Sequence, residues 1–132
     1  MTIDLKFNHT LNPRYCETDQ GGRIHHASLV PWLEEARVAY LEHVGIHYQD
    51  VEAEGFVLVV RGLEIRYKAA LQFGAPVRVN TQVSKLGKAS VDFMYELFQN
   101  EKLCATATTE LACVGRDGRP VALPQNLAKQ LA

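Results

Sequence analysis

Two kinds of hydrophobic spacing divide the chain. Between Ala27 and Gly45, apolar residues recur every three or four positions, as they do along one face of an α-helix. Further apolar residues lie off this face, so the pattern predicts a long helix that is enclosed on most sides. Ser28 is a candidate N-cap, and Gly45 is typical of a helix end. The main stripe consists of Leu29, Trp32, Leu33, Ala36, Tyr40 and Val44.

Most of the remaining chain alternates apolar and polar residues, which is the period of a β-strand. The alternation predicts strands over residues 3–14, 56–68, 76–85, 89–99 and 102–115. Turn residues separate the later strands at 86–88, 100–101 and 117–118. A short helical turn or a loop is expected at 47–54, and a short helix at 123–131. In the strand at 56–68, the predicted inward set is Val57, Val59, Leu63, Ile65 and Tyr67.

The order of these elements indicates an α+β fold. One strand precedes the long helix, and about four antiparallel strands follow it in a meander. A helix that is apolar on most sides needs a sheet that curls around it, and twisted strands can do this. The length of 132 residues predicts one domain over residues 1–132, without repeats or a linker.

Composition and charge narrow the classes of function. With a net charge of −1, the chain lacks the excess of positive charge that would attract a nucleic-acid backbone or an anionic membrane. No apolar run approaches the ~18 residues of a membrane span, and the first ten residues lack the pattern of a signal peptide. The three cysteines have no CxxC spacing, which is typical of reduced thiols. We therefore expect a cytoplasmic protein that binds neither nucleic acid nor membrane.

Candidate chemistry gathers where the turn at 17–23 meets the long helix. Asp19 lies in this turn, and His25 and His26 stand just before the helical pattern. A helix start presents free N–H groups and positive partial charge, so an acid and an imidazole there are candidates for a site. An Asp in a glycine-containing turn can also serve the turn alone. Adjacent histidines seldom face one ion, so we expect no metal and no cofactor.

The same stretch resembles the hotdog-fold thioesterases. The nearest group is the branch of 4-hydroxybenzoyl-CoA thioesterase and the tol-pal-associated acyl-CoA thioesterase, and the resemblance covers nearly the whole chain. It implies a curved antiparallel sheet wrapped around one long central helix. It also implies homodimers formed by extending the sheet, often paired into homotetramers, with active sites at the dimer interface. The matching residues are Tyr15, Thr18, Asp19, Gly22, His26, Ala27, Ser28, Glu34, Ala36, Arg37 and Gly45.

The resemblance also assigns roles to residues. Asp19 falls on the catalytic carboxylate, and the backbone N–H at His26 falls on the oxyanion donor, with a histidine side chain retained there. The chain departs from the family pattern at Gln20 and at His25, where an aromatic residue is usual, so these two positions bear on substrate identity. The expected substrate-binding residues are His25, Gly22, Glu34, Tyr67, Lys85 and Lys88, of which Lys85 and Lys88 are candidates for the phosphates of coenzyme A.

These residue types suit thioester hydrolysis. A thiol has a pKa near ~8.5, so its thiolate leaves with little help from an acid. An ionised carboxylate can act as nucleophile or general base, and N–H groups at a helix start can stabilise the oxyanion. The expected function is hydrolysis of an acyl-CoA or acyl-carrier-protein thioester. The alternatives are a hydratase of the same fold, which uses a differently placed Asp and His pair, and a non-catalytic acyl-CoA-binding module. The sequence leaves the acyl group open.

Overall fold

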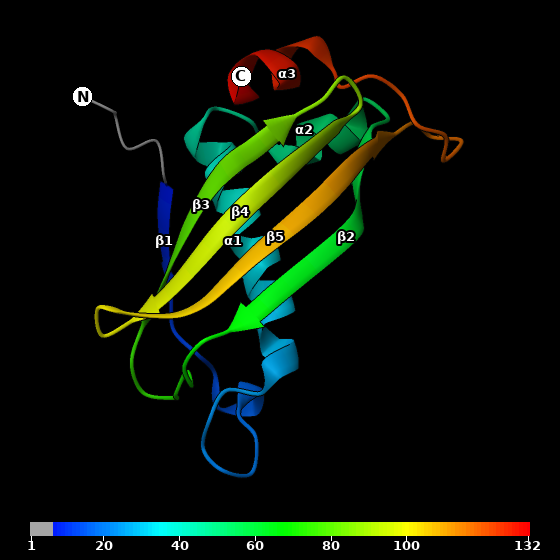
Figure 1. Cartoon of the computed structure of the whole chain (residues 1–132). Helices are drawn as coiled ribbons and strands as arrows, with labels where there is room; N and C mark the ends of the chain where they lie inside the picture. Colours follow the sequence, from blue (N-terminus) through cyan, green and yellow to red (C-terminus); the bar gives the residue numbers. More distant parts are fainter. Residues whose placement is uncertain (1–6) are drawn as a thin grey trace, which may run out of the picture.

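A curved antiparallel sheet of five strands wraps around one long helix in the computed structural model, which describes residues 7–132 (Figure 1). The helix α1 lies on the concave face of the sheet, and its buried side chains form the core with those of the central strands. This is the hotdog architecture expected from the sequence. Of the first strand predicted over residues 3–14, residues 7–11 form a strand, and residues 3–6 lie outside the described region. The strands are β1 (Phe7–Leu11), β2 (Val57–Tyr67), β3 (Val77–Leu86), β4 (Ser90–Gln99) and β5 (Lys102–Val114), and the helices are α1 (Leu29–His43), α2 (Tyr48–Ala53) and α3 (Gln125–Leu131), with 3-10 turns η1 (Tyr15–Glu17) and η2 (His26–Ser28).

The strand order is β1-β3-β4-β5-β2, which corrects the expected simple meander. Only β3, β4 and β5 follow one another as neighbours, while β2 pairs with β5 along the far edge. The connection after β2 is too long for a tight hairpin, and it crosses the end of the sheet. Gln99 holds this crossing, because its amide accepts from Gln72 N–H at 2.9 Å and donates to the carbonyl oxygens of Gln72 and Ala75 at 2.8 and 2.9 Å. Both β1 and β2 therefore end the sheet as edge strands.

The helix α1 buries the stripe predicted from its sequence, except that Val44 at its end is only half-buried. Val30 and Val38 are 44% and 37% exposed, so the expectation of a helix enclosed on most sides is wrong for a single chain. Ser28 does not cap the helix, because its backbone is already helical and its hydroxyl bonds elsewhere. Gly45 adopts a φ of +90°, which favours glycine and fits the end of the helix just before it.

A β-bulge changes the face that β2 turns toward the helix. The register shifts between Val60 and Gly62, so one extra residue interrupts the alternation. Before the bulge, Leu58 is buried while Val57 and Val59 are exposed, which reverses the predicted inward set. After the bulge, Ile65 is half-buried as predicted, whereas Leu63 and Tyr67 are 46% and 52% exposed although they were also predicted to point inward. The strand as a whole stays more exposed than its sequence indicated, because no other strand covers its outer edge.

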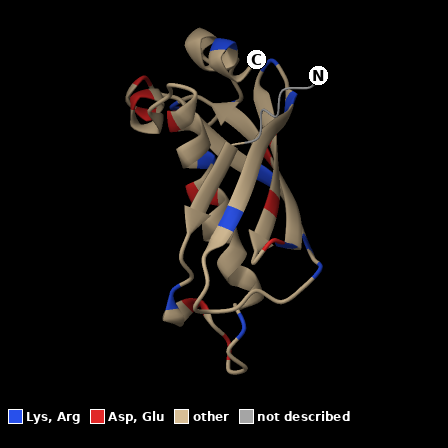
Figure 2. Ribbon diagram, turned by 90° about the vertical axis from the view of Figure 1, so that its left-hand side faces the viewer, with Lys and Arg blue, Asp and Glu red and all other residues tan. Residues whose placement is uncertain are grey.

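Charged residues of both signs are interspersed over helices, strands and loops (Figure 2). Within residues 7–132, no helix is long and apolar enough to cross a membrane. All three cysteines are free thiols, with Cys16 exposed and the other two buried.

Candidate active site

The turn that carries Asp19 fixes one of its two carboxylate oxygens. Asp19 Oδ1 accepts hydrogen bonds from the backbone N–H groups of Gly21 and Arg23, at 2.8 and 3.1 Å. The Asp19 N–H donates in return to the carbonyl oxygen of Arg23 at 2.7 Å. Gly22 adopts a φ of +79°, which a glycine tolerates without strain. Oδ2 has no hydrogen-bond partner among the described residues, so one oxygen is held and the other is free for chemistry.

The start of the helical segment leaves one backbone N–H unused. His25 donates its own N–H to the carbonyl oxygen of Glu17 at 2.8 Å, and its ring Nδ1 accepts from the Ala27 N–H at 3.1 Å. Between these two, the His26 N–H donates to no residue in the described part of the chain. An N–H at a helix start without an acceptor is suited to a developing negative charge. The rings of His25 and His26 stack with centroids 4.2 Å apart.

Glu17 clamps the Asp19 turn onto the helix, which the sequence analysis did not anticipate. Glu17 is 8% exposed, and its carboxylate accepts from the Arg14 N–H at 2.7 Å and from the Trp32 indole N–H at 2.9 Å. Its carbonyl oxygen accepts from the hydroxyl of Ser28 at 3.0 Å. Burial alone would raise the pKa of Glu17. The hydrogen bonds from Arg14 and Trp32 and the Arg14 charge outweigh burial, and the pKa is lowered. The buried Trp32 indole needs an acceptor, which is the signal that could have identified this acid.

Tyr67 holds the helix start from the other side. Its hydroxyl donates to the carbonyl oxygen of His26 at 2.8 Å, across 41 positions of sequence. The sequence analysis placed Tyr67 among the substrate-binding residues. In the structure, Tyr67 contacts the backbone of His26, the residue whose N–H has no acceptor.

These elements enclose one cavity of about 360 Å³. Asp19 and His26 both line it, so the two residues expected to act together lie together. Tyr67 lines the same cavity. Arg23 and Lys68 add two cations that the sequence analysis did not connect with the site. The apolar part of the lining consists of Ile24, Leu29, Ala69, Ala70 and Leu71.

The other expected substrate-binding residues lie elsewhere in the single chain. Gly22 and His25 shape the turn and the helix start and do not line the cavity. Lys85 lies near the end of β3 and Lys88 in the β3–β4 turn, at the opposite end of the sheet from the Asp19 turn (Figure 1). Glu34 lines a different cavity. Within residues 7–132 there is no cluster of three or more His, Cys, Asp or Glu residues that could hold a metal ion.

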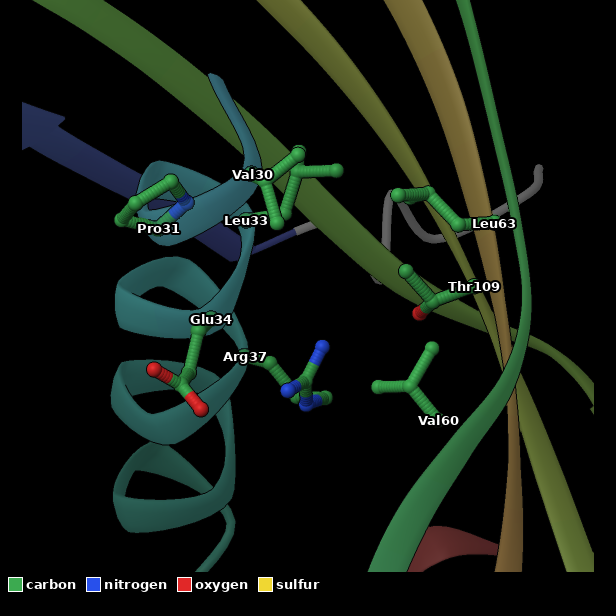
Figure 3. A pocket seen from close by; sticks show the side chains of 8 residues that line it. All are labelled: Val30, Pro31, Leu33, Glu34, Arg37, Val60, Leu63 and Thr109. Carbon is green, nitrogen blue, oxygen red and sulfur yellow. The ribbon is translucent and has the colours of Figure 1, made fainter. Parts of the chain in front are cut away.

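A second cavity, of about 180 Å³, lies between α1 and β2 (Figure 3). Its lining is mostly apolar, but the Arg37 side chain projects from α1 toward it. Arg37 Nη1 donates to the Tyr95 hydroxyl at 3.2 Å, and this hydroxyl bonds Thr109 Oγ1 at 2.7 Å. Burial raises the pKa of Tyr95, which keeps its hydroxyl neutral. The cavity is lined by Val30, Pro31, Leu33, Glu34, Arg37, Val60, Leu63 and Thr109.

Comparison with known proteins agrees with this architecture. The Thioesterase-like superfamily matches residues 13–131. The acyl-CoA thioesterase YbgC of Haemophilus influenzae is 31% identical over 127 residues, covering 95% of this chain and 93% of the relative. A DHNA-CoA thioesterase from Staphylococcus aureus is 32% identical with a TM-score of 0.87, covering 89% of this chain and 80% of that one. The hypothetical protein TT1821 from Thermus thermophilus is 32% identical with a TM-score of 0.91, covering 94% and 95%. The chain therefore belongs to the thioesterase-like superfamily and is a thioester hydrolase with the hotdog fold.

Proposed function

We propose that this enzyme hydrolyses acyl-CoA thioesters at the cavity shared by Asp19 and His26. One observation carries the proposal: a carboxylate with one free oxygen and a backbone N–H without an acceptor line the same cavity. A thioester needs both an attacking group at its carbonyl carbon and a donor at its carbonyl oxygen. Acyl-carrier-protein thioesters present the same reacting group, and CoA is favoured because the named relatives act on CoA esters.

In the proposed reaction, the thioester oxygen points at the His26 N–H. Asp19 Oδ2 either attacks the carbonyl carbon or takes a proton from a water that attacks it. Negative charge then develops on the carbonyl oxygen, and the His26 N–H stabilises it. The C–S bond breaks and the thiolate leaves. If Asp19 is the nucleophile, its acyl group is then held as a mixed anhydride, which water hydrolyses to release the acid and restore the carboxylate. In sum, water supplies the new C–O bond of the acid and a proton for the thiol.

Arg23 and Lys68 are the proposed contacts for the phosphates of CoA. Both line the Asp19 cavity and both are exposed, so their charges reach solvent at its mouth. Arg and Lys bind phosphate through charge-assisted hydrogen bonds. Lys85 and Lys88 remain candidates only if a second subunit brings their turn to the site.

We further propose that the enzyme works as a homodimer formed through β2, and that two dimers pair to form the expected homotetramer. This strand is eleven residues long, and β5 pairs with only one of its edges. Val59, Val60, Leu63 and Tyr67 on it are each more than two-fifths exposed. A long apolar edge strand is an aggregation hazard unless another chain covers it. The free cysteines fit the expected cytoplasmic location.

Replacing Asp19 with Asn tests the proposal. The side-chain oxygen of Asn can keep both backbone hydrogen bonds, so the turn should fold. We expect release of thiol from acyl-CoA to fall at least about a hundredfold, since the attacking group is lost. Asp50→Asn is the matched control, because Asp50 is an exposed acid on α2 with no side-chain hydrogen bond in the described region. Activity of Asp19→Asn within tenfold of wild type would contradict the proposal.

Two further measurements separate the remaining alternatives. Binding of acyl-CoA by the wild type without release of thiol would identify a non-catalytic binding module. If hydrolysis occurs, rapid quenching followed by intact-mass measurement distinguishes the two routes. An acyl adduct on Asp19 indicates nucleophilic attack, whereas its absence throughout a single turnover favours general-base catalysis.

A further inference from the structure

Arg37 is a buried cation without a carboxylate partner in the described region. The residue is 8% exposed, yet no acid among residues 7–132 lies within ion-pair distance of its guanidinium. Its one hydrogen bond goes to the hydroxyl of Tyr95. A guanidinium has five N–H donors, so most of them are unused. A charge removed from water without a counter-charge is costly, so the single chain leaves Arg37 uncompensated.

Glu34, one helical turn before Arg37, is an exposed acid that also has no partner in the described region. Both residues line the cavity between α1 and β2. Figure 3 shows the Glu34 carboxylate pointing in a different direction from the Arg37 guanidinium, which projects toward Val60 and Thr109. One stretch of α1 therefore carries an unpaired acid at its surface and an unpaired cation buried beside it.

The acid lies in an apolar stripe of α1 that the sheet of the same chain does not cover. Val30, Glu34 and Val38 recur every four residues and so share one side of the helix. The two valines are 44% and 37% exposed. Across the cavity, Val60 and Leu63 on β2 are 45% and 46% exposed. Exposed apolar surface thus runs from α1 to the strand edge proposed as the subunit contact, which indicates that one partner covers both.

The level of the cavity along both elements places the two charges near the centre of such a contact. Glu34 and Arg37 line it from α1, and Val60 and Leu63 line it from β2. Val60 and Leu63 flank the middle of β2, and the middle of α1 falls between Glu34 and Arg37. A two-fold axis through the middle of β2 runs the second copy of each element antiparallel to the first. Glu34 of one subunit then lies opposite Arg37 of the partner subunit.

We propose that a second copy of this chain covers the face formed by α1 and β2, and that Glu34 of each subunit pairs with the buried Arg37 of the other. This inference rests on the proposed homodimer through β2, and it adds the helix to that contact. A two-fold contact repeats each interaction, so two ion pairs form. Within each subunit, Tyr95 and Thr109 hold the guanidinium in place before the subunits meet.

Mixed dimers with reversed charges test this inference. Glu34→Arg gives a subunit with two cations at the contact, and Arg37→Glu gives a subunit with two acids. Each variant alone sets like charges against each other, so its dimer dissociation constant should rise at least about a hundredfold. A mixture of the two should form heterodimers with a constant within about tenfold of the wild type, because every acid then faces a cation. Native mass spectrometry identifies the heterodimer, and sedimentation measures the constants.

The mixture separates a contact between subunits from a contact within one chain. If Glu34 instead turned toward Arg37 of its own chain, each variant would keep its like charges after mixing, and the dimer would not be restored. A mixture that forms no heterodimer therefore overturns the inference. So do single variants that dimerise as tightly as the wild type.

Variants of Glu34 alone cover the case in which Arg37→Glu fails to fold. Glu34 is exposed, so Glu34→Arg and Glu34→Gln should both fold and weaken the dimer, the charge reversal more strongly. Glu42→Arg is the matched control, because Glu42 is exposed on α1 roughly 80° around the helix from Glu34. Equal dissociation constants for Glu34→Arg and Glu42→Arg overturn the inference. A wild type that dimerises regardless of these charges leaves the β2 contact standing, whereas a monomeric wild type overturns both, and thiol release tests the proposed reaction separately.

Discussion

The hydroxyl of Tyr67 donates a 2.8 Å hydrogen bond to the backbone carbonyl oxygen of His26. This contact ties the end of the edge strand β2 to the short 3-10 turn that precedes α1. The N–H of the same residue, His26, is the proposed oxyanion donor. The strand thereby holds the backbone on which that donor is mounted, and it does so from the far side of the cavity.

Replacing Tyr67 with Phe should lower kcat and change KM little. The lost bond is worth about 1 kcal/mol, which corresponds to a roughly fivefold slower reaction if it acts on the transition state. Tyr15→Phe is the matched control, because Tyr15 is 78% exposed and its hydroxyl has no partner in the described region. Melting temperatures of both variants establish that the fold is retained.

Inhibitors distinguish positioning of the oxyanion donor from simple packing by Tyr67. A trifluoromethyl ketone analogue of acyl-CoA forms an oxyanion in the site, whereas a CoA thioether does not. The Tyr67→Phe variant should bind the ketone more weakly and the thioether as well as the wild type does. Equal loss of affinity for both inhibitors would mean that Tyr67 serves the cavity wall alone.

The hydrogen bonds of the Glu17 carboxylate to Arg14 and Trp32 should make the stability of the protein depend on pH. The pKa of Glu17 is lowered in the folded protein, so the charged form stabilises the fold above the unfolded value of about 4.5. This contribution is lost as the pH falls from that value through the lower, folded pKa. Glu17→Gln should cost about 2 kcal/mol at neutral pH, through weaker bonds to Arg14 and Trp32.

Denaturant unfolding at several pH values checks this prediction. The difference in unfolding free energy between wild type and Glu17→Gln should shrink as the pH falls below about 4.5. Glu42→Gln is a suitable control, because Glu42 is exposed near the end of α1. A difference that stays constant down to pH 3 would show that the charge of Glu17 does not stabilise the clamp.

The cations at the mouth of the Asp19 cavity should govern affinity for the CoA portion. Lys68→Ala and Arg23→Ala should each raise KM about three- to tenfold and leave kcat nearly unchanged, because the lost phosphate contact takes no part in the reaction at the carbonyl. The effect should diminish at high salt, since ions screen exposed charges. Lys88→Ala is the comparison. If it raises KM while Lys68→Ala does not, the phosphates bind at the β3–β4 turn of a partner subunit.

The local sequence pattern predicted burial correctly where apolar and polar residues alternate without interruption. Val91, Phe93, Tyr95 and Leu97 alternate along β4, and all are buried as expected. The Asp19 turn was recognisable because it combines glycines, an acid and a helix start within a few residues. Such features depend on neighbours in sequence, so the sequence contains most of the information that determines them.

Features decided by distant residues were not predictable in this way. The bulge near Arg61 reverses the face of β2, and it arises from pairing with β5 about fifty positions later. The burial of Arg37 depends on Tyr95, which is 58 positions away, and an arginine on a helix is ordinarily expected at the surface. The contact between Tyr67 and His26 likewise requires the completed sheet. The chemistry of the site therefore depends on tertiary contacts that no local pattern contains.

The exposed edge of β2 should be the contact between two subunits. Val59 is 43% exposed on this strand, and a lysine there is a common means of keeping an edge strand unpaired. We expect the wild type to have at least the mass of a dimer in solution by light scattering, and Val59→Lys to shift it toward the monomer. Met94→Lys is the matched control for Val59→Lys, because Met94 is also 43% exposed but lies on the central strand β4. If each site requires both subunits, dissociation should lower kcat/KM more than tenfold, and activity should recover as the protein concentration rises. A monomeric wild type with full activity would contradict both the interface and the shared site.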